Sequence, residues 1–270
     1  MKNKLLISIL CCSTLLSSTA FSKQSFVKVD DIQYEVHSQG QGENTIVFES
    51  GFGTGADTWD TLIDSLGSEY KTIAYSRVGT GQTKPSDRTL TIEQHISQLH
   101  RLTKEMGLTE PFTLVGHSYG GLVSAEFARQ HPTAVKALIL IDPAVRAQRT
   151  IFKKIAPQQI QRDDVMMLKY MPKHLADDYQ LLLRQMDGST SKITPIEKKL
   201  PVVLLTSTKV SDQPFVFEET KQGKAAWLKM HNKLFENVEV GYHYRINDSG
   251  HSIHKEKAEA VVNAIAYLLQ

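Results

Sequence analysis

Short apolar runs and longer amphipathic segments alternate along the chain after residue 26. The runs that resemble buried strands lie at 45–49, 71–76, 112–115, 135–141, 201–206 and 242–246. Two further short strands, 26–29 and 32–36, flank the Asp30-Asp31 turn and are expected to pair antiparallel.

Segments with a helical repeat separate these runs. The clearest begins at Thr91, where Gln94 completes a capping-box pattern, and it stops at Gly107. Its apolar face is formed by Ile92, Ile96, Leu99, Leu102 and Met106. Further helices are expected at 119–130 and from 258 to the end. The alternation predicts an α/β domain with an open, mostly parallel central sheet flanked by helices.

Residues 145–199 interrupt this alternation. The segment is rich in methionine and has no convincing strand pattern, so short helices are expected. It is either a plain surface insertion or a cap above the carboxyl ends of the strands. We expect a helical cap.

Residues 1–22 have a different pattern. Two lysines precede a mostly apolar stretch, 5–16, and small residues surround Ala20 and Ser22, the order found in secretory signal peptides. Twelve helical residues span only about 18 Å, which is short of a bilayer core. We therefore expect a signal peptide, a mature domain at 23–270, export to the periplasm or the medium, and no stable membrane anchor after cleavage.

The composition is that of an ordinary globular protein. Of 270 residues 41% are apolar and 22% charged, which excludes disorder, collagen and coiled coil. The net charge of +2 does not suggest a nucleic-acid partner. The two cysteines, Cys11 and Cys12, are adjacent and lie in the expected signal peptide, so neither a disulfide framework nor a zinc site is expected.

The strongest motif is Gly116-His117-Ser118-Tyr119-Gly120, which matches G-x-S-x-G. It lies between a predicted strand and a predicted helix, the context of a nucleophile elbow, where a sharp turn exposes the serine oxygen. A chance match in a glycine-containing loop would lack that context. Ser118 is therefore the candidate nucleophile.

With this motif the chain resembles the α/β-hydrolase family, from about residue 26 to the end. Four motifs carry the resemblance: Glu49-Ser50-Gly51-Phe52-Gly53, Tyr75-Ser76-Arg77-Val78-Gly79-Thr80-Gly81, Gly116-His117-Ser118-Tyr119-Gly120-Gly121, and Gly250-His251. The resemblance implies an α/β-hydrolase fold and a catalytic triad in the order serine, acid, histidine.

The resemblance also implies the partners of the nucleophile. His251 follows a strand and a Ser-Gly turn and is the expected base, and the backbone amides of Phe52 and Tyr119 are the expected oxyanion hole. Two positions depart from the family: Ser50 stands where relatives often have histidine, and Ser76 where they often have aspartate. The second departure puts a structural hydrogen bond in question.

The acid has two candidates. The family usually places it after the strand at 201–206, where Val210 cannot serve and Asp212 lies two residues further. The second family location, the end of the preceding strand, is occupied by Asp142. We favour Asp142 and keep Asp212 as the alternative. Asp248, three residues before the expected base, is interpreted as a turn residue.

Two other kinds of site are weaker alternatives. His251 and His254 form H-x-x-H, but neither a third ligand nor an H-E-x-x-H motif supports a metal. Segment 51–56 fits a loose G-x-G-x-x-A nucleotide fingerprint, yet Ser76 stands near the end of the next strand, where an acidic residue is expected. We expect no metal and no cofactor.

These observations favour an exported serine hydrolase that cleaves an ester-type bond of a small molecule, like a carboxylesterase or lipase, through an acyl-enzyme. The same residues also serve amide, lactone and carbon–carbon hydrolysis and acyl transfer, so those reactions stay open. A dinucleotide-binding protein and a non-catalytic hydrolase fold are the remaining alternatives.

Overall fold

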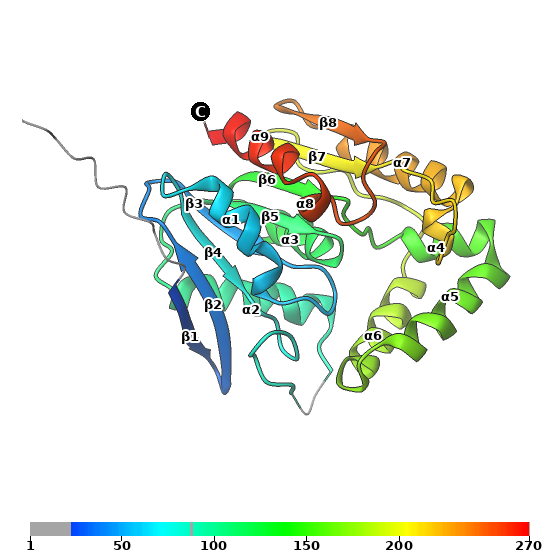
Figure 1. The fold of residues 1–270 in the computed structure, drawn as a ribbon, viewed down its shortest axis with the longest axis horizontal. Helices are drawn as coiled ribbons and strands as arrows, with labels where there is room; N and C mark the ends of the chain where they lie inside the picture. The colour runs from blue at the N-terminus through cyan, green and yellow to red at the C-terminus, as the bar shows by residue number, and fades with distance from the viewer. Residues whose placement is uncertain (1–22, 87–88, 270) are drawn as a thin grey trace, which may run out of the picture.

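A single eight-stranded sheet organises the protein (Figure 1). The structure, a computed structural model, describes residues 23–86 and 89–269, and the expected signal peptide at 1–22 lies outside them. The strand order is β1-β2-β4-β3-β5-β6-β7-β8. The strands are β1 (Lys23–Val29), β2 (Ile32–Gln39), β3 (Thr45–Glu49), β4 (Lys71–Tyr75), β5 (Phe112–His117), β6 (Val135–Ile141), β7 (Val202–Ser207) and β8 (Gly241–Ile246).

The pairing confirms the expected α/β architecture. β1 pairs antiparallel with β2 and β2 antiparallel with β4, whereas every pair from β4 to β8 is parallel. Parallel strands therefore make up the centre of the sheet, and their carboxyl ends meet at one edge. β5 runs beyond the predicted end at 115 because Gly116 and His117 still pair with β6.

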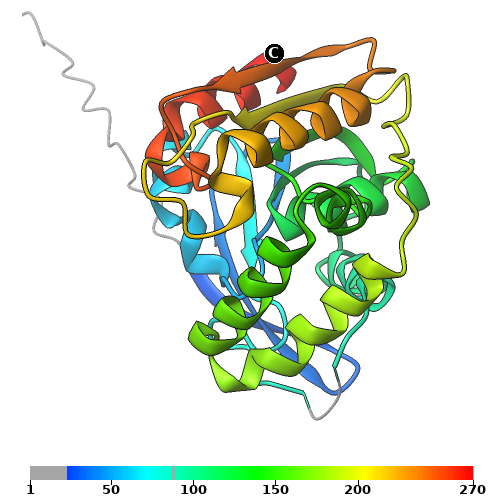
Figure 2. The same cartoon turned by 90° about the vertical axis from the view of Figure 1, so that its right-hand side faces the viewer.

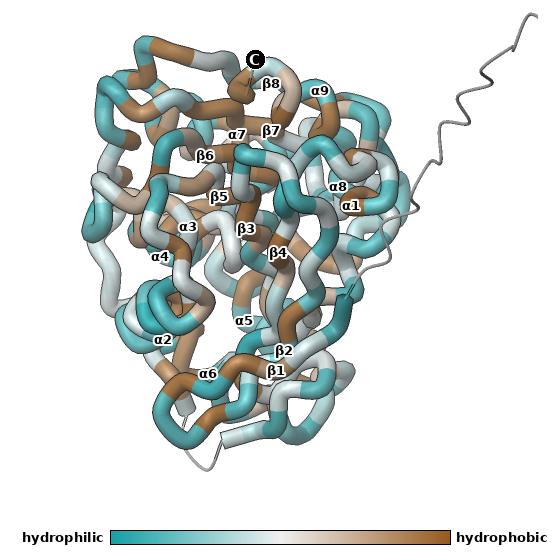
Figure 3. The backbone as a smooth tube through the Cα atoms, turned by 90° about the vertical axis from the view of Figure 1, so that its left-hand side faces the viewer, coloured by the Kyte–Doolittle hydropathy of each residue, from teal (hydrophilic) through white to brown (hydrophobic). Residues whose placement is uncertain are grey.

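Helices cover both faces of the sheet. One face carries α2 (Ile92–Glu105), α3 (Tyr119–Gln130) and α7 (Lys221–Phe235), and the other carries α1 (Asp60–Leu66), the short α8 (Ile253–Glu256) and α9 (Ala258–Leu269). Successive side chains of β6 alternate between the two cores: Leu138 and Leu140 pack on the first side, Ile139 and Ile141 on the second. Figure 3 shows the hydrophobic residues concentrated in these central strands.

Helix α2 begins as the sequence predicts. The Thr91 hydroxyl accepts a hydrogen bond from the Gln94 amide at 3.2 Å, and the Gln94 side chain accepts one from the Thr91 amide at 2.8 Å. Gly107 follows the helix with φ of +70°, a conformation that glycine adopts without strain. Helix α7, in contrast, is an element that the sequence pattern did not indicate.

The insertion at 145–199 contains α4 (Gln148–Ile155), α5 (Pro157–Tyr170) and α6 (Lys173–Asp187). These helices lie on the side toward which the parallel strands point, and Figure 2 looks directly onto α5 and α6. Arg149 ties the three together: its guanidinium donates two hydrogen bonds to Asp164, at 2.6 and 2.8 Å, and reaches Asp187 at 3.0 Å. Within residues 23–86 and 89–269, no helix is both long and apolar enough to cross a membrane.

Candidate active site

Ser118 occupies a strained turn between β5 and α3. Its φ of +54° and ψ of −121° are unusual for a residue with a side chain. The surrounding backbone fixes this turn, because the Ser118 amide donates to the Ile141 carbonyl and the Ser118 carbonyl accepts from the Ala144 and Leu122 amides, at 2.9 to 3.2 Å. The strand-to-helix context expected from the sequence is present, and it holds the serine beside the carboxyl end of β6.

The motif glycines are required because the backbone approaches itself closely here. A Cβ atom at Gly120 would lie 2.2 Å from the Glu49 carbonyl oxygen, and one at Gly116 would lie 2.4 Å from the Ser124 hydroxyl. Both distances are shorter than any real contact of a Cβ atom. Any larger residue at either position would push the elbow away from β3 or α3.

A continuous chain of hydrogen bonds joins Ser118, His251 and Asp142. The Ser118 Oγ lies 2.8 Å from His251 Nε2, and His251 Nδ1 lies 2.7 Å from Asp142 Oδ2. The structure thus brings together the expected nucleophile, the expected base and the favoured acid. Asp212 is exposed in the loop after β7, and no contact between it and His251 is found among the described residues.

Asp142 is fully buried and all its hydrogen-bonding needs are met. Its Oδ1 accepts from the Ser207 amide at 2.9 Å and from Trp227 Nε1 at 2.8 Å, which leaves Oδ2 for His251. Burial raises the pKa of this carboxyl, but the hydrogen bond from His251 and the nearby positive charges outweigh burial and hold the pKa below its usual range. The carboxylate form is therefore stable in the interior.

The loop that carries His251 is attached to the elbow. His117 Nε2 lies 3.0 Å from the His251 carbonyl, and because a carbonyl only accepts, this nitrogen carries the hydrogen and donates. The Gly250 amide on the same loop donates to the Glu256 carboxylate at 2.9 Å. His117, the second residue of the motif, therefore positions the backbone of His251 and does not face Ser118 as a base.

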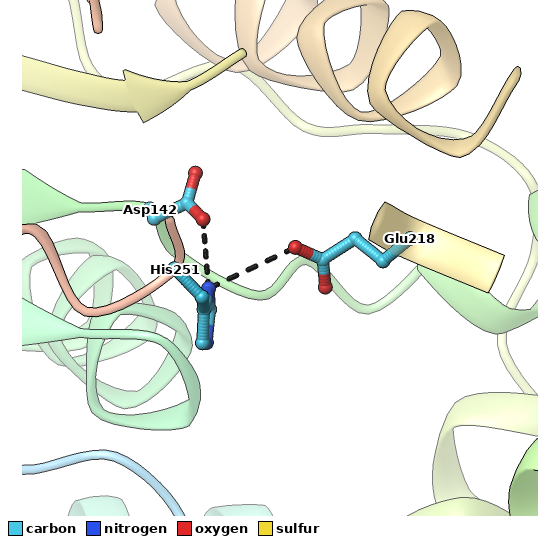
Figure 4. A group of neighbouring side chains, drawn as sticks. All are labelled: Asp142, Glu218 and His251. Atoms are coloured by element: carbon cyan, nitrogen blue, oxygen red, sulfur yellow. Dashed lines mark hydrogen bonds and ion pairs between the residues drawn. The ribbon is translucent and has the colours of Figure 1, made fainter. Parts of the chain in front are cut away.

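A second carboxylate lies at the same imidazole (Figure 4). Glu218, in the short 3-10 helix η2 (Phe217–Glu219), has its Oε1 3.8 Å from His251 Nδ1. Burial lowers the pKa of His251, but the charges of Glu218 and Asp142 outweigh it and raise the pKa to about 9. No pattern in the sequence indicates this role for Glu218, because only the folded chain brings the segment after β7 back to His251.

Within the described residues, Asp142, Glu218 and His251 also form a group whose potential metal-ligand atoms lie within 4.8 Å of one another. Each Asp142 oxygen already accepts at least one hydrogen bond, and Glu218 is paired with Lys224 at 3.2 Å. These contacts fit an acid–base arrangement better than an open set of ligands.

The turn after β3 lies beside the elbow, where the oxyanion hole is expected. A Cβ atom at Gly51 would be 3.6 Å from the Ser118 Cβ, and the rings of Phe52 and Tyr119 meet edge to face with centroids 5.9 Å apart. The Tyr119 amide opens α3, so the helix itself offers it no acceptor. Both residues named by the sequence therefore flank Ser118.

A buried cation holds this turn in place. The Arg77 guanidinium donates to the Ser50 carbonyl at 2.7 Å and to the Gly51 carbonyl, and it forms an ion pair with the fully buried carboxylate of Glu49. The Tyr75 hydroxyl donates to the same carboxylate. The backbone before Phe52 is thereby fixed from the carboxyl end of the neighbouring strand β4.

Both departures from the family pattern have their own hydrogen-bond partners. The Ser50 hydroxyl donates to the Gly55 carbonyl at 3.0 Å and accepts from the Trp59 indole at 2.8 Å. The Ser76 hydroxyl accepts from the Ala56 amide at 2.8 Å and donates to Glu35 at 2.7 Å. Ser76 therefore forms two buried hydrogen bonds, one of them to a carboxylate that Glu35 supplies.

Helix α6 of the insertion packs against this turn. The rings of Tyr179 and Phe52 have centroids 5.4 Å apart, and a Cβ atom at Gly53 would lie 3.3 Å from Leu175. His174 Nε2 lies 3.1 Å from the Gly79 carbonyl, in the loop after β4. The insertion thus reaches the loops that surround Ser118.

The fold and the assembled site define the class of protein. Residues 44–198 match the family model described as the alpha/beta hydrolase fold. The chain belongs to this family.

Individual relatives are distant in sequence. The chain is 24% identical over 238 residues to protein YqjL of Bacillus subtilis (strain 168), with 85% of each chain covered. Among solved structures it is similar to a serine hydrolase involved in carbazole degradation, the CarC enzyme (TM-score 0.65, 19% identity, 92% of this chain and 99% of that chain). It is also similar to carboxylesterase CesB of Bacillus subtilis (TM-score 0.61, 16% identity, 92% of both). At these identities the structural matches establish the fold.

Proposed function

We propose that the protein is a serine hydrolase that cleaves an ester-type bond of a small molecule through an acyl-enzyme. The observation that carries the proposal is the hydrogen-bonded chain from Ser118 through His251 to Asp142, at 2.8 and 2.7 Å. The carboxylesterase and the serine hydrolase among the structural neighbours support the same class of reaction.

In the proposed first step, the neutral imidazole of His251 takes the proton of Ser118 through Nε2 while Oγ attacks the carbonyl carbon of the ester. The amides of Phe52 and Tyr119 donate hydrogen bonds to the oxygen that becomes negative. The imidazolium then returns its proton to the leaving alcohol. Water repeats the sequence on the acyl-enzyme and releases the acid.

Asp142 has an orienting role in this scheme. Its Oδ2 fixes Nδ1 as the protonated nitrogen of the neutral ring, which leaves Nε2 free to accept the serine proton. The Ser207 amide and the Trp227 indole hold the carboxylate from the other side. The base is therefore kept in the required tautomer before any substrate binds.

Two further parts of the proposal concern the rest of the chain. We propose that the insertion at 145–199 is a cap that selects the acyl group, because Tyr179 and Leu175 of α6 contact the turn that carries Phe52. We also propose that residues 1–22 direct export and are then removed, on the sequence pattern alone.

Covalent labelling tests the nucleophile. A fluorophosphonate probe is expected to label the purified protein, and Ser118→Ala is expected to abolish labelling because the attacking oxygen is gone. Ser124→Ala is a matched control: this serine is also buried beside the elbow but makes no hydrogen bond to a base in the described part of the chain. Undiminished labelling of Ser118→Ala would overturn the assignment.

A substrate panel tests the bond class. We expect turnover of p-nitrophenyl esters of graded chain length, with a lactone and an aminoacyl anilide as comparisons. Faster turnover of the lactone or the anilide than of every ester would move the proposal to that bond type.

A further inference from the structure

Two acids face one nitrogen of the proposed base. Asp142 Oδ2 lies 2.7 Å from His251 Nδ1 and forms the hydrogen bond, and Glu218 Oε1 lies 3.8 Å from the same atom. Figure 4 shows both carboxylates directed at this nitrogen. At 3.8 Å the Glu218 contact is an ion pair without a hydrogen bond, about one ångström longer than the bond to Asp142.

The position of Glu218 is fixed by its surroundings. Its carboxylate accepts a hydrogen bond from Lys224 Nζ at 3.2 Å, and the lysine side chain is only 5% exposed. The preceding residue, Phe217, donates its amide to Asp163 of α5 at 2.7 Å. Lys224 belongs to α7, so η2 is held between the insertion and that helix.

The charges around His251 favour a protonated ring. Asp142 and Glu218 carry negative charges and Lys224 carries one positive charge. The other imidazoles nearby, those of His117, His231 and His254, are neutral near pH 7, because burial lowers the pKa of each. Two anions against one cation leave a net negative charge, and the charge of Glu218 is the largest single cause that raises the pKa of His251, beside the hydrogen bond and the charge of Asp142.

We propose that Glu218 is a positioning residue that acts as a second acid for His251: it stabilises the imidazolium together with Asp142 and partly replaces Asp142 when that residue loses its charge. The proposal rests on the proposed function only in so far as His251 acts as the base. It assigns to Glu218 no contact with the substrate.

A direct titration tests the electrostatic part. The pKa of His251 is measured by NMR from the chemical shift of the imidazole Cε1–H, in the wild-type protein and in Glu218→Gln. Removal of one charge at this distance is expected to lower the pKa of His251 by roughly one to three pH units. An unchanged pKa would overturn the proposal.

The matched control is Glu219→Gln. Glu219 lies in the same turn, but its carboxylate accepts from the Phe215 amide at 2.6 Å and no ion pair with His251 is found among the described residues. Glu219→Gln is expected to leave the pKa of His251 close to the wild-type value. An equal decrease in both variants would indicate a general effect of the turn and would also overturn the proposal.

Turnover tests the second acid. Asp142→Asn is expected to retain a residual rate, and adding Glu218→Gln is expected to lower that rate by about a further tenfold. If the single and double variants have equal rates and both are folded by circular dichroism, Glu218 does not take over the role of Asp142. The two proposals can fail separately. If the wild-type protein shows neither turnover nor probe labelling, but Glu218→Gln still lowers the pKa of His251, the proposed function fails and the electrostatic role of Glu218 stands.

Discussion

Ser118 and Asp142, two members of the proposed triad, share an unusual backbone conformation. Among the described residues, three non-glycine positions have positive φ: Asp30, Ser118 and Asp142. A residue with a Cβ atom is destabilised in such a conformation, so the surrounding hydrogen bonds must compensate. This strain places the two side chains toward His251 from neighbouring strand ends.

The backbone strain at Ser118 is expected to lower the free energy of unfolding, which can be measured. Ser118→Gly removes the Cβ atom and is expected to raise the free energy of unfolding by about 1 kcal/mol relative to Ser118→Ala, which keeps it. Urea unfolding of the two inactive variants checks this difference. Ser118→Gly being no more stable than Ser118→Ala would show that the turn is unstrained.

The raised pKa of His251 sets the pH dependence. The proposed mechanism requires the neutral imidazole, and the carboxylates of Glu218 and Asp142 raise the pKa of the ring to about 9 despite its burial. We therefore expect kcat/KM to increase about tenfold per pH unit below this value and to become constant above it. A profile measured from pH 6 to 10.5 tests this, and a midpoint near pH 6.5 would contradict the effect of the two acids.

At the scale of elements, the site depends on contacts between segments far apart in the sequence. Helix α7 supplies Trp227 to Asp142 and Lys224 to Glu218, and α6 of the insertion contacts Phe52 in the turn after β3. α7 joins the sheet to η2, and η2 in turn is bonded to α5. A change in the insertion can therefore affect the surroundings of His251 as well as those of Phe52.

The contact of α6 with Phe52, in the turn after β3, predicts a change of specificity in the proposed enzyme. Tyr179→Ala removes the ring that packs on Phe52 and is expected to shift the preferred acyl chain length, while fluorophosphonate labelling of Ser118 continues. Tyr170→Ala is the control, since Tyr170 is 65% exposed at the end of α5. Identical chain-length profiles for Tyr179→Ala and the wild type would contradict the role of the insertion as a cap.

At the scale of the whole molecule, the site is a product of sheet order. β3, β5, β6 and β7 are neighbours, and their carboxyl ends lead to Gly51, Ser118, Asp142 and the Ser207 amide at one edge of the sheet. β4 completes this edge with Arg77. Each strand thus contributes one part of the site, and the two cores on either side keep the strands in register.

The buried pair of Arg77 and Glu49 predicts a large effect on stability. Arg77→Met leaves the fully buried carboxylate without its cation and is expected to lower the free energy of unfolding by roughly 3–5 kcal/mol. Adding Glu49→Gln is expected to recover part of this loss. Urea unfolding provides the measurement.

The control for this pair is Arg101→Met. Arg101 is paired with Asp30 at the surface, where the two side chains are 52% and 60% exposed. Its loss is expected to change the free energy of unfolding by less than about 1 kcal/mol. Similar effects of Arg77→Met and Arg101→Met would show that burial of the first pair has no energetic consequence.

Residues that are adjacent along the chain can be predicted from its sequence, whereas contacts between distant segments cannot. The elbow is local: the strand, the glycines and the helix around Ser118 are adjacent, so the pattern predicts them. Asp142 could be located because it directly ends an apolar strand. Glu218 and Trp227 could not, because their roles depend on where the chain returns after β7.

Helix α7 was missed for a local reason as well. Gly223 lies in its first turn and weakens the helical pattern. A Cβ atom there would lie 2.0 Å from the Phe217 carbonyl oxygen, so the close approach of η2 requires glycine. Gly223 therefore weakens the helical pattern in the sequence and also gives η2 the room that places Glu218 near His251.

The hydrogen bond from His117 to the His251 carbonyl has a consequence for thermal motion. It links the loop that carries His251 to the residue next to Ser118, across 134 positions of the chain. Because this bond links the two segments, we expect small displacements of the end of β5 to move the His251 loop in the same direction. We therefore expect the distance between Ser118 Oγ and His251 Nε2 to vary less than the distance between either residue and the helices that cover the sheet.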